Sequence, residues 1–415
     1  MQSQAVSAQT ENRPKESARL YSLDWLRVIA IGGVFLYHAV HPFDFFDWHI
    51  KNAEQSMAIT VVMGLLFPWG MPFFFLIAGT GSWFALRRRT AGQFVGERVK
   101  RLLIPYITGC ILLWPIMLYF QWRHILWKGA WSGSFLDFVL SHRAGFSPMW
   151  FGEVGFHLWF LGFLFCFSVL GLPIFLWLKS RSGQAALARL AGFCSHRGGI
   201  LLFIVPLLLV RLILQPFFPQ EHDWADFFFL MTLFVCGFVL YAHEGFARAV
   251  RRDWPILLAG ALITSAGWAY LALTTENLEI EAPVRTARQV LIWSFVSANA
   301  WCWSAFMLFV GMRFLDFTNQ WLVYAQEAVL PFFLLHQPVI IVIAYFVVQW
   351  HTGIFPKLVT VVIGSLLVTL SLYEFVIRRV GFLRTIFGMK ATARPAAAPR
   401  EATPAGPGES LPHLR

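Results

Sequence analysis

An arginine and a histidine stand eleven residues apart in the first apolar stretch of the chain, at Arg27 and His38. Eleven residues make three helical turns plus about 20° of rotation, so both side chains would share one helix face, with His38 about 16 Å deeper. Asp24 and His41 fall within about 40° of the same line. Ionisable groups on a membrane helix are costly unless they line a polar cavity. His38 is therefore a candidate general base, supported by Arg27 and Asp24; the alternative is a core histidine satisfied by a neighbouring helix.

A second set of candidates is basic. Arg98 and Arg101 stand three residues apart at the predicted start of the third apolar segment, so on a helix they share a face. Arg88 belongs to an arginine run just before them. Because arginine binds phosphate bidentately, these side chains could hold the phosphates of coenzyme A. The alternative is the ordinary excess of positive charge in cytoplasmic loops.

Two further histidines are candidate substrate contacts. Glu153 and His157 are four residues apart, close enough on a helix to hydrogen-bond. The pair is either a substrate contact or a structural pair, and we expect no metal, because one Glu and one His make a weak metal signal. His336 is followed by Gln337 and Pro338, and a proline frees a backbone carbonyl. We expect His336 to line the same cavity or to bond across the bundle.

Composition sets the fold class that must position these residues. Hydrophobic residues make up 58% of the 415 and charged residues 13%, whereas a soluble domain carries roughly a quarter charged residues. Apolar runs of about 18 residues or more recur, each long enough to cross a bilayer. Backbone groups in lipid must be satisfied within the segment, so these runs are helices. The sequence predicts an all-α, polytopic membrane helix bundle of about ten transmembrane helices.

The organisation along the chain follows from these runs. We predict a polar cytoplasmic tail at 1–20, a transmembrane domain at 21–390 and a disordered cytoplasmic tail at 391–415. Most of the 33 Lys and Arg residues fall in alternate connections, which predicts that both termini are cytoplasmic. The predicted spans are 25–43, 57–86, 102–120, 156–178, 199–219, 224–242, 255–274, 289–312, 328–349 and 357–377.

Three smaller features bear on the shape of one span, on the partner and on the membrane anchor. The span at 57–86 is too long for a straight crossing and contains several Pro and Gly residues, so we predict that it is kinked or broken. The net charge of +11 is explained by cytoplasmic loops, so we expect the lipid bilayer and not a nucleic acid as a partner. We see no removable signal peptide and expect the first span to be an uncleaved anchor.

Taken in order, these stretches resemble the membrane-bound acyltransferase family three, which includes polysaccharide O-acetyltransferases. The Arg-x10-His pair of that family corresponds to Arg27 and His38, and its Arg-x-x-Arg pair to Arg98 and Arg101. Three further similar stretches begin at Phe73, His157 and Leu335. The Arg-Leu-Leu-Ile-Pro and His-Gln-Pro stretches are most similar to the branch of the glucan succinyltransferases.

The resemblance implies a function and roles for the candidate residues. It implies that His38 is essential with Arg27 supporting it, and that Arg98 and Arg101 act on the acyl-CoA side. The donor would be acetyl-CoA or succinyl-CoA from the cytoplasm, and the acceptor a hydroxyl of an extracytoplasmic glycan or glycolipid. The location would be the bacterial inner membrane, with a homo-oligomer as one option.

Two other function classes stay open from the sequence alone. A proton-coupled transporter or exporter of a small molecule or glycan would use the Asp24, Arg27 and His38 stripe as a pathway. It predicts internal repeats, which the sequence does not display. A non-catalytic scaffold that kept the fold is disfavoured by the intact Arg27, His38, Arg98 and Arg101.

Overall fold

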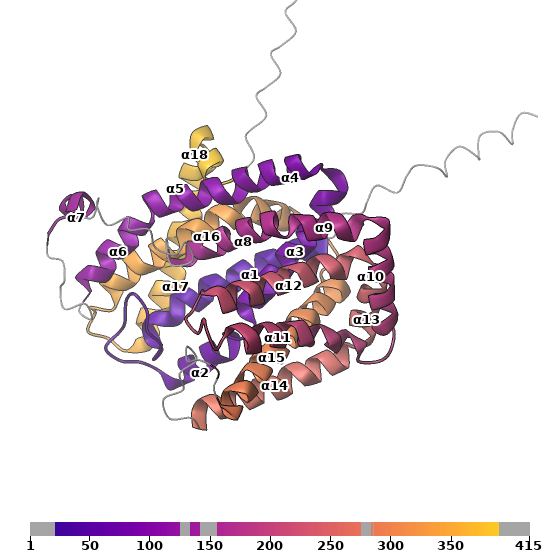
Figure 1. Ribbon diagram of the computed structural model, residues 1–415. Helices are drawn as coiled ribbons and strands as arrows, with labels where there is room; N and C mark the ends of the chain where they lie inside the picture. The colour runs from indigo at the N-terminus through magenta and orange to yellow at the C-terminus, as the bar shows by residue number, and fades with distance from the viewer. Residues whose placement is uncertain (1–20, 125–132, 142–155, 275–283, 285, 390–415) are drawn as a thin grey trace, which may run out of the picture.

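The fold is a bundle of helices. The computed structural model describes residues 21–124, 133–141, 156–274, 284 and 286–389, and within these ranges every regular element is a helix. The long helices run roughly side by side; α9, α10 and α13 lie at one end of the bundle and α6 and α7 at the other (Figure 1). The predicted all-α class is confirmed.

Eight helical segments in the described ranges are long and apolar enough to cross a membrane. A ninth candidate is the pair Phe156–Leu170 and Leu172–Lys179, which is bent by 45°, and Gly199–Leu214 is a shorter apolar segment. Each of these overlaps a predicted span, so the polytopic bundle is confirmed. The eight are Tyr21–Phe43, Met57–Arg88, Ala91–Arg123, Trp224–Ala242, Trp254–Thr274, Ala287–Phe314, Gln320–Val347 and Ile354–Ile377.

The first half of the chain builds these segments from several shorter helices. The elements are α1 (Tyr21–Val40), η1 (His41–Phe43), α2 (Met57–Leu66), α3 (Gly70–Arg88), α4 (Ala91–Arg98), η2 (Val99–Leu103), α5 (Ile104–Leu112), α6 (Trp114–Arg123), α7 (Phe135–Ser141), η5 (Phe156–Leu158), α8 (Trp159–Leu170), α9 (Leu172–Lys179) and α10 (Arg181–Phe193).

The second half contains the longer helices. They are η6 (Gly199–Phe203), α11 (Ile204–Leu214), α12 (Trp224–Ala242), α13 (Glu244–Arg252), α14 (Trp254–Thr274), α15 (Ala287–Phe314), α16 (Gln320–Val347), α17 (Ile354–Ser371), η7 (Leu372–Ile377) and α18 (Gly381–Ile386).

The predicted break in the second span is present. The helix stops after Leu66 and restarts at Gly70, with a turn between them in which Trp69 N donates to Leu66 O at 3.3 Å. Pro68 stands in this turn, and a proline in a helix interior would remove a hydrogen bond and clash with the preceding turn. The span is therefore two helices, α2 and α3, as predicted.

The third span differs from its prediction. The segment predicted as a cytoplasmic loop, 87–101, is largely helical, because α4 begins at Ala91 under a capping box formed by Thr90 and Gln93. The helix then continues through the π-helical turn η2, where Ile104 N bonds Val99 O. Pro105 follows and has no N–H to offer the preceding turn. The proline explains why the helix widens here instead of ending.

Helices α3 and α12 approach each other closely enough for their backbones to touch. A Cβ at Gly79 would collide with the carbonyl oxygen of Phe234, and one at Gly237 would collide with the carbonyl of Leu76. Small residues that let helix backbones meet are the usual packing device of membrane helices. This contact fixes α3, which carries the residues that the site arginines touch.

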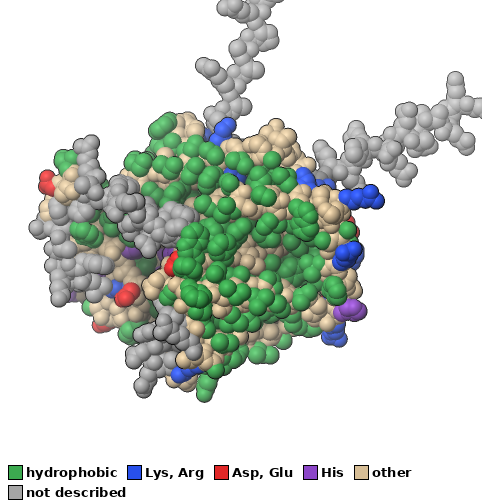
Figure 2. Space-filling model, in the orientation of Figure 1, with side chains coloured by type: hydrophobic (Ala, Val, Ile, Leu, Met, Phe, Trp, Pro, Cys, Tyr) green, Lys and Arg blue, Asp and Glu red, His purple; other side chains and the backbone are tan. Residues whose placement is uncertain are grey.

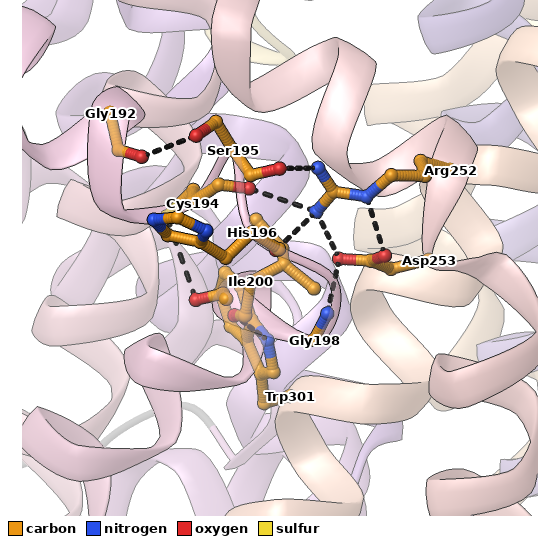
Figure 3. Close-up of polar contacts among 10 residues, drawn as sticks. Gly192, Cys194, Ser195, His196, Gly198, Ile200, Arg252, Asp253 and Trp301 are labelled. Carbon is orange, nitrogen blue, oxygen red and sulfur yellow. Dashed lines mark hydrogen bonds and ion pairs between the residues drawn. The ribbon is translucent and has the colours of Figure 1, made fainter.

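A network of hydrogen bonds and one ion pair links the turn after α10 to the end of α13 (Figure 3). The guanidinium of Arg252 pairs with Asp253 and donates to three backbone carbonyls of that turn. Asp253 also accepts from Gly198 N at 3.1 Å, and Trp301 of α15 donates to Ile200 O at 3.0 Å. The contact with α15 holds this end of the bundle together. The three carbonyls belong to Cys194, Ser195 and His196.

The surface has the character of a lipid-facing protein. Hydrophobic side chains cover most of the face in Figure 2, and most of the visible Lys and Arg side chains lie towards the edge near α9, α10 and α13. Large apolar side chains in the middle of spans are exposed, among them Leu36, Ile263 and Leu367. An apolar belt of this kind indicates a multi-pass membrane protein.

Candidate active site

Arg27 and Arg98 come from different helices and meet at the same place on α3. Arg27 Nη2 lies so close to Gly81 that a Cβ there would be 2.6 Å from it. Arg98 Nη2 donates to Ser82 Oγ at 3.1 Å, and its guanidinium lies 4.7 Å from the ring centre of Phe94. The Nε of Arg98 is buried and has no hydrogen-bond partner among the described residues. The structure thus brings together two arginines that the sequence placed in separate motifs.

The other predicted phosphate contacts lie further out. Arg101 pairs with Glu97 at 3.5 Å, and its side chain is 40% exposed. It does not form a symmetrical clamp with Arg98, because the π-helical turn between them places more residues in each turn and rotates them apart. Arg88 ends α3 and is exposed. Arg98 nevertheless lies within electrostatic range of Arg27, Arg89 and Arg101, so the region is strongly positive.

Asp24 lies one helical turn before Arg27 and pairs with it. The carboxylate oxygen Oδ1 lies 3.2 Å from Arg27 Nη1, and Asp24 is buried. The side chain of Arg27 is 39% exposed, so the pair is partly solvated. The structure therefore places Asp24 with the arginines and not with His38, which lies about four turns further along α1.

His38 meets both of the other predicted histidines in one cluster. The ring centres of His38 and His336 are 5.3 Å apart, and those of His336 and His157 are 5.1 Å apart. These residues come from α1, α16 and η5, so three segments distant in sequence converge here. Trp48 covers the cluster, with its ring 6.4 Å from His38 and nearly parallel to it. The structure therefore brings His336 next to His38, and its lining of a shared cavity stays a prediction.

The sequence placed His41 close to the stripe of Arg27 and His38, but it gave no signal for Asp44 and Lys51, which follow the end of α1. Asp44 Oδ2 lies 2.6 Å from His41 Nδ1, and Asp44 Oδ1 lies 2.7 Å from Lys51 Nζ. Asp44 is fully buried, so the ion pair with Lys51 compensates its charge. Burial lowers the pKa of Lys51, and the hydrogen bond to Asp44 opposes that shift. Asp44 and Lys51 lie beyond the end of α1, so the helical spacing that relates Arg27 to His38 does not extend to them.

A second missed group links His49 to two glutamines. His49 Nδ1 lies 2.8 Å from Gln121 Oε1, and His49 Nε2 lies 3.0 Å from Gln337 Nε2. An amide oxygen only accepts and an amide nitrogen only donates, so Nδ1 carries the proton and Nε2 accepts. Burial lowers the pKa of His49 to about 4. Gln337 stands beside His336 in the His-Gln-Pro stretch, which was the only available signal.

Two of the clustered histidines bond one backbone carbonyl. Phe333 O lies 2.6 Å from His336 Nδ1 and 3.1 Å from His157 Nε2. Both rings therefore donate to it, which fixes one tautomer for each. Pro338 stands five residues later in α16 and has no N–H, which leaves the neighbouring carbonyl of Leu334 without its helical bond. The sequence predicted a freed carbonyl at this stretch, and the carbonyl of Leu334 is the neighbour of the one that both histidines bond.

Some predictions fall elsewhere. Glu153 lies outside the described residues, so its pairing with His157 stays a prediction. No group of three or more His, Cys, Asp or Glu in the described part of the chain could hold a metal ion. Arg211, whose role the sequence left open, pairs with Asp226 at 2.6 Å and stacks on Trp293 at 4.2 Å. That arginine joins α11, α12 and α15, and its contacts are structural.

Comparison with known proteins identifies the family. The family model described as an acyltransferase domain matches residues 20–374. Glucans biosynthesis protein C of Salmonella schwarzengrund is 22% identical over 399 residues, covering 90% of this chain and 95% of that protein. The protein of the same name from Salmonella paratyphi A is 23% identical over 347 residues, covering 77% and 82%. The chain belongs to this acyltransferase family, as its motifs indicated, and is a multi-pass membrane O-acyltransferase.

Proposed function

We propose that the chain transfers an acetyl or succinyl group from cytoplasmic acyl-CoA to a hydroxyl of an extracytoplasmic glycan or glycolipid. The observation that carries the proposal is a pair of polar clusters, one towards each end of α1. Arg27 and Arg98 meet on α3 at one end, and His38 meets two other histidines about 16 Å further along. Coenzyme A also has two ends, with phosphates at one and the thioester at the other.

The arginine end suits the phosphates. Arg98 has a buried N–H without a partner in the described ranges, and Arg27, Arg101 and Arg89 add positive charge around it. Guanidinium groups form strong, charge-assisted bonds to phosphate oxygens. The pantetheine arm of the donor would then follow α1 towards His38.

The histidine end suits the chemistry. His38 would take the proton of the acceptor hydroxyl as its oxygen attacks the thioester carbon, and the coenzyme would leave as the thiolate. His157 and His336 would contact the acceptor, and Glu153 is a further candidate. The name of the relatives, glucans biosynthesis protein C, supports a glucan as the acceptor.

The arrangement in the cell follows from the same reasoning. The bacterial inner membrane, with both termini in the cytoplasm, would put the arginine end where acyl-CoA is available. The excess of Lys and Arg in the predicted inner connections supports this orientation. The transporter alternative has lost its support, because the chain belongs to an acyltransferase family.

Binding of coenzyme A tests the donor assignment. We expect the purified chain in detergent to bind acetyl-CoA or succinyl-CoA, and Arg98→Gln to weaken that binding by roughly tenfold to a hundredfold, the size of a lost bond to a charged group. Arg248→Gln is the matched control, because Arg248 is an exposed arginine at the α10 and α13 end. Equal affinity of the native chain and Arg98→Gln would remove Arg98 from the donor site, and no binding to the native chain would remove the acyl-CoA assignment.

A further inference from the structure

For two buried histidines of the cluster, the contacts show which ring nitrogen donates a hydrogen bond and which accepts one. His336 Nδ1 faces Phe333 O at 2.6 Å, and a carbonyl oxygen only accepts, so Nδ1 carries the proton. The same carbonyl accepts from His157 Nε2 at 3.1 Å. In a neutral imidazole the other nitrogen then carries a lone pair. His336 Nε2 and His157 Nδ1 are therefore hydrogen-bond acceptors.

These acceptors are buried and unsatisfied within the described part of the chain. His336 is 1% exposed and His157 is 6% exposed, and neither His336 Nε2 nor His157 Nδ1 has a partner there. A third such atom is Oε1 of Gln337, which is 2% exposed and whose amide nitrogen is already used by His49. A buried polar atom without a partner is costly, so a ligand that supplies the missing hydrogen bonds would be stabilised here.

All three atoms accept hydrogen bonds, and this determines which kind of ligand they can bind. A group that satisfies them must donate hydrogen bonds, as hydroxyl groups do. A carboxylate or phosphate offers only acceptors and would face lone pairs with lone pairs. The rings of Trp48 and Phe156 lie beside His49, at 5.2 and 4.2 Å, so apolar surface adjoins the polar atoms, as in most ligand sites.

We propose that His157 Nδ1, His336 Nε2 and Gln337 Oε1 form the acceptor subsite, and that they bind the hydroxyl groups of an uncharged sugar. The inference rests on the proposed function, since the sugar is the acceptor of the acyl group, and it goes further by assigning atoms and a ligand charge. His38 lies 5.3 Å from His336 between ring centres, so a hydroxyl held by the subsite is next to the base. An anionic sugar is a poor ligand for this set.

Two substitutions remove the acceptor atom and keep the structural bond. In His336→Asn the amide nitrogen can occupy the place of Nδ1 and donate to Phe333 O, while Nε2 is lost. In His157→Gln the amide nitrogen can occupy the place of Nε2, while Nδ1 is lost. His351→Asn is the control, because His351 is an exposed histidine in the turn between α16 and α17.

The experiment is calorimetric titration of the full chain in detergent with a neutral glucose trisaccharide and no coenzyme A. The native chain and His351→Asn are expected to bind it equally, and each subsite variant to bind about three- to tenfold more weakly, the size of one lost hydrogen bond. A trisaccharide with one glucuronate unit is expected to bind more weakly than the neutral one. Unchanged affinity in both subsite variants, tighter binding of the glucuronate compound, or no binding at all would overturn the inference.

A second measurement separates this inference from the proposed function. Release of free coenzyme A thiol from acyl-CoA is followed on the same native preparation. If the native chain releases thiol but both subsite variants bind the sugar with native affinity, the subsite is wrong and the acyltransferase proposal stands. Sugar binding that follows the predicted variant pattern, without any use of acyl-CoA, would support the subsite and contradict the donor assignment.

Discussion

His49 is neutral because it is buried, and this makes it a source of acid sensitivity. Burial lowers its pKa from 6.5 to about 4 in the folded chain, so between these values the unfolded chain binds more protons than the folded one. Stability rises with pH wherever the unfolded state binds more protons. The contribution of His49 is therefore complete above about pH 6.5 and is lost as the pH falls towards 4.

This predicts a pH-dependent thermal stability in detergent. Lowering the pH from 7.5 to 5 should lower the unfolding midpoint, with a loss of up to about 1.4 kcal/mol per pH unit from this one group. His49→Gln should flatten the dependence, because the titrating group is gone. His351→Gln should keep the native slope, since His351 is exposed. If the unfolding midpoint depends on pH equally in the native chain and in His49→Gln, then His49 is not the cause of the pH dependence.

Other residues show how far a sequence can locate a site. The eleven-residue spacing of Arg27 and His38 predicted their shared stripe, because helical geometry alone fixes it. The meeting of Arg27 and Arg98 at Gly81 and Ser82 could not be predicted, since it depends on how three helices pack. The same holds for His49, whose partners lie 72 and 288 residues away.

At the scale of elements, the contact between α3 and α12 supports the arginine end of the site. Gly237→Ala should destabilise the chain by roughly 1–3 kcal/mol, because the added methyl group collides with the Leu76 carbonyl and overpacking costs about that much. Thermal unfolding in detergent measures the effect. Gly364→Ala in α17 is the matched control, since a Cβ there meets only the Ile343 side chain at 3.8 Å. Equal stability of the two variants would show that the close approach does not matter.

Element boundaries show where local patterns fail. The break between α2 and α3 was predictable, because Pro68 and Gly70 act on their own backbone. The start of α4 was not, because its capping box outweighed the polar composition that suggested a loop. The π-helical turn before Pro105 was also unforeseen, and it separates the directions of Arg98 and Arg101.

At the scale of the whole molecule, the bundle places two kinds of chemistry at different depths. The apolar belt fixes the helices across the membrane, and α1 runs between a positive region and a histidine cluster. Composition predicted the belt because the bilayer demands it. Which side chains α16 and η5 contribute to the cluster was decided by packing, although the histidines themselves stood out as polar residues in apolar segments.

The most direct test of the account is acyl transfer by the purified chain in detergent. Thiol release from acetyl-CoA and from succinyl-CoA is measured with a neutral glucan acceptor, comparing the native chain with His38→Ala and with His351→Ala as control. The account predicts turnover of one donor by the native chain and the control, and a fall of about 10²- to 10⁴-fold in His38→Ala, the size of a lost general base. A His38→Ala chain that turns over acyl-CoA at the native rate would contradict it.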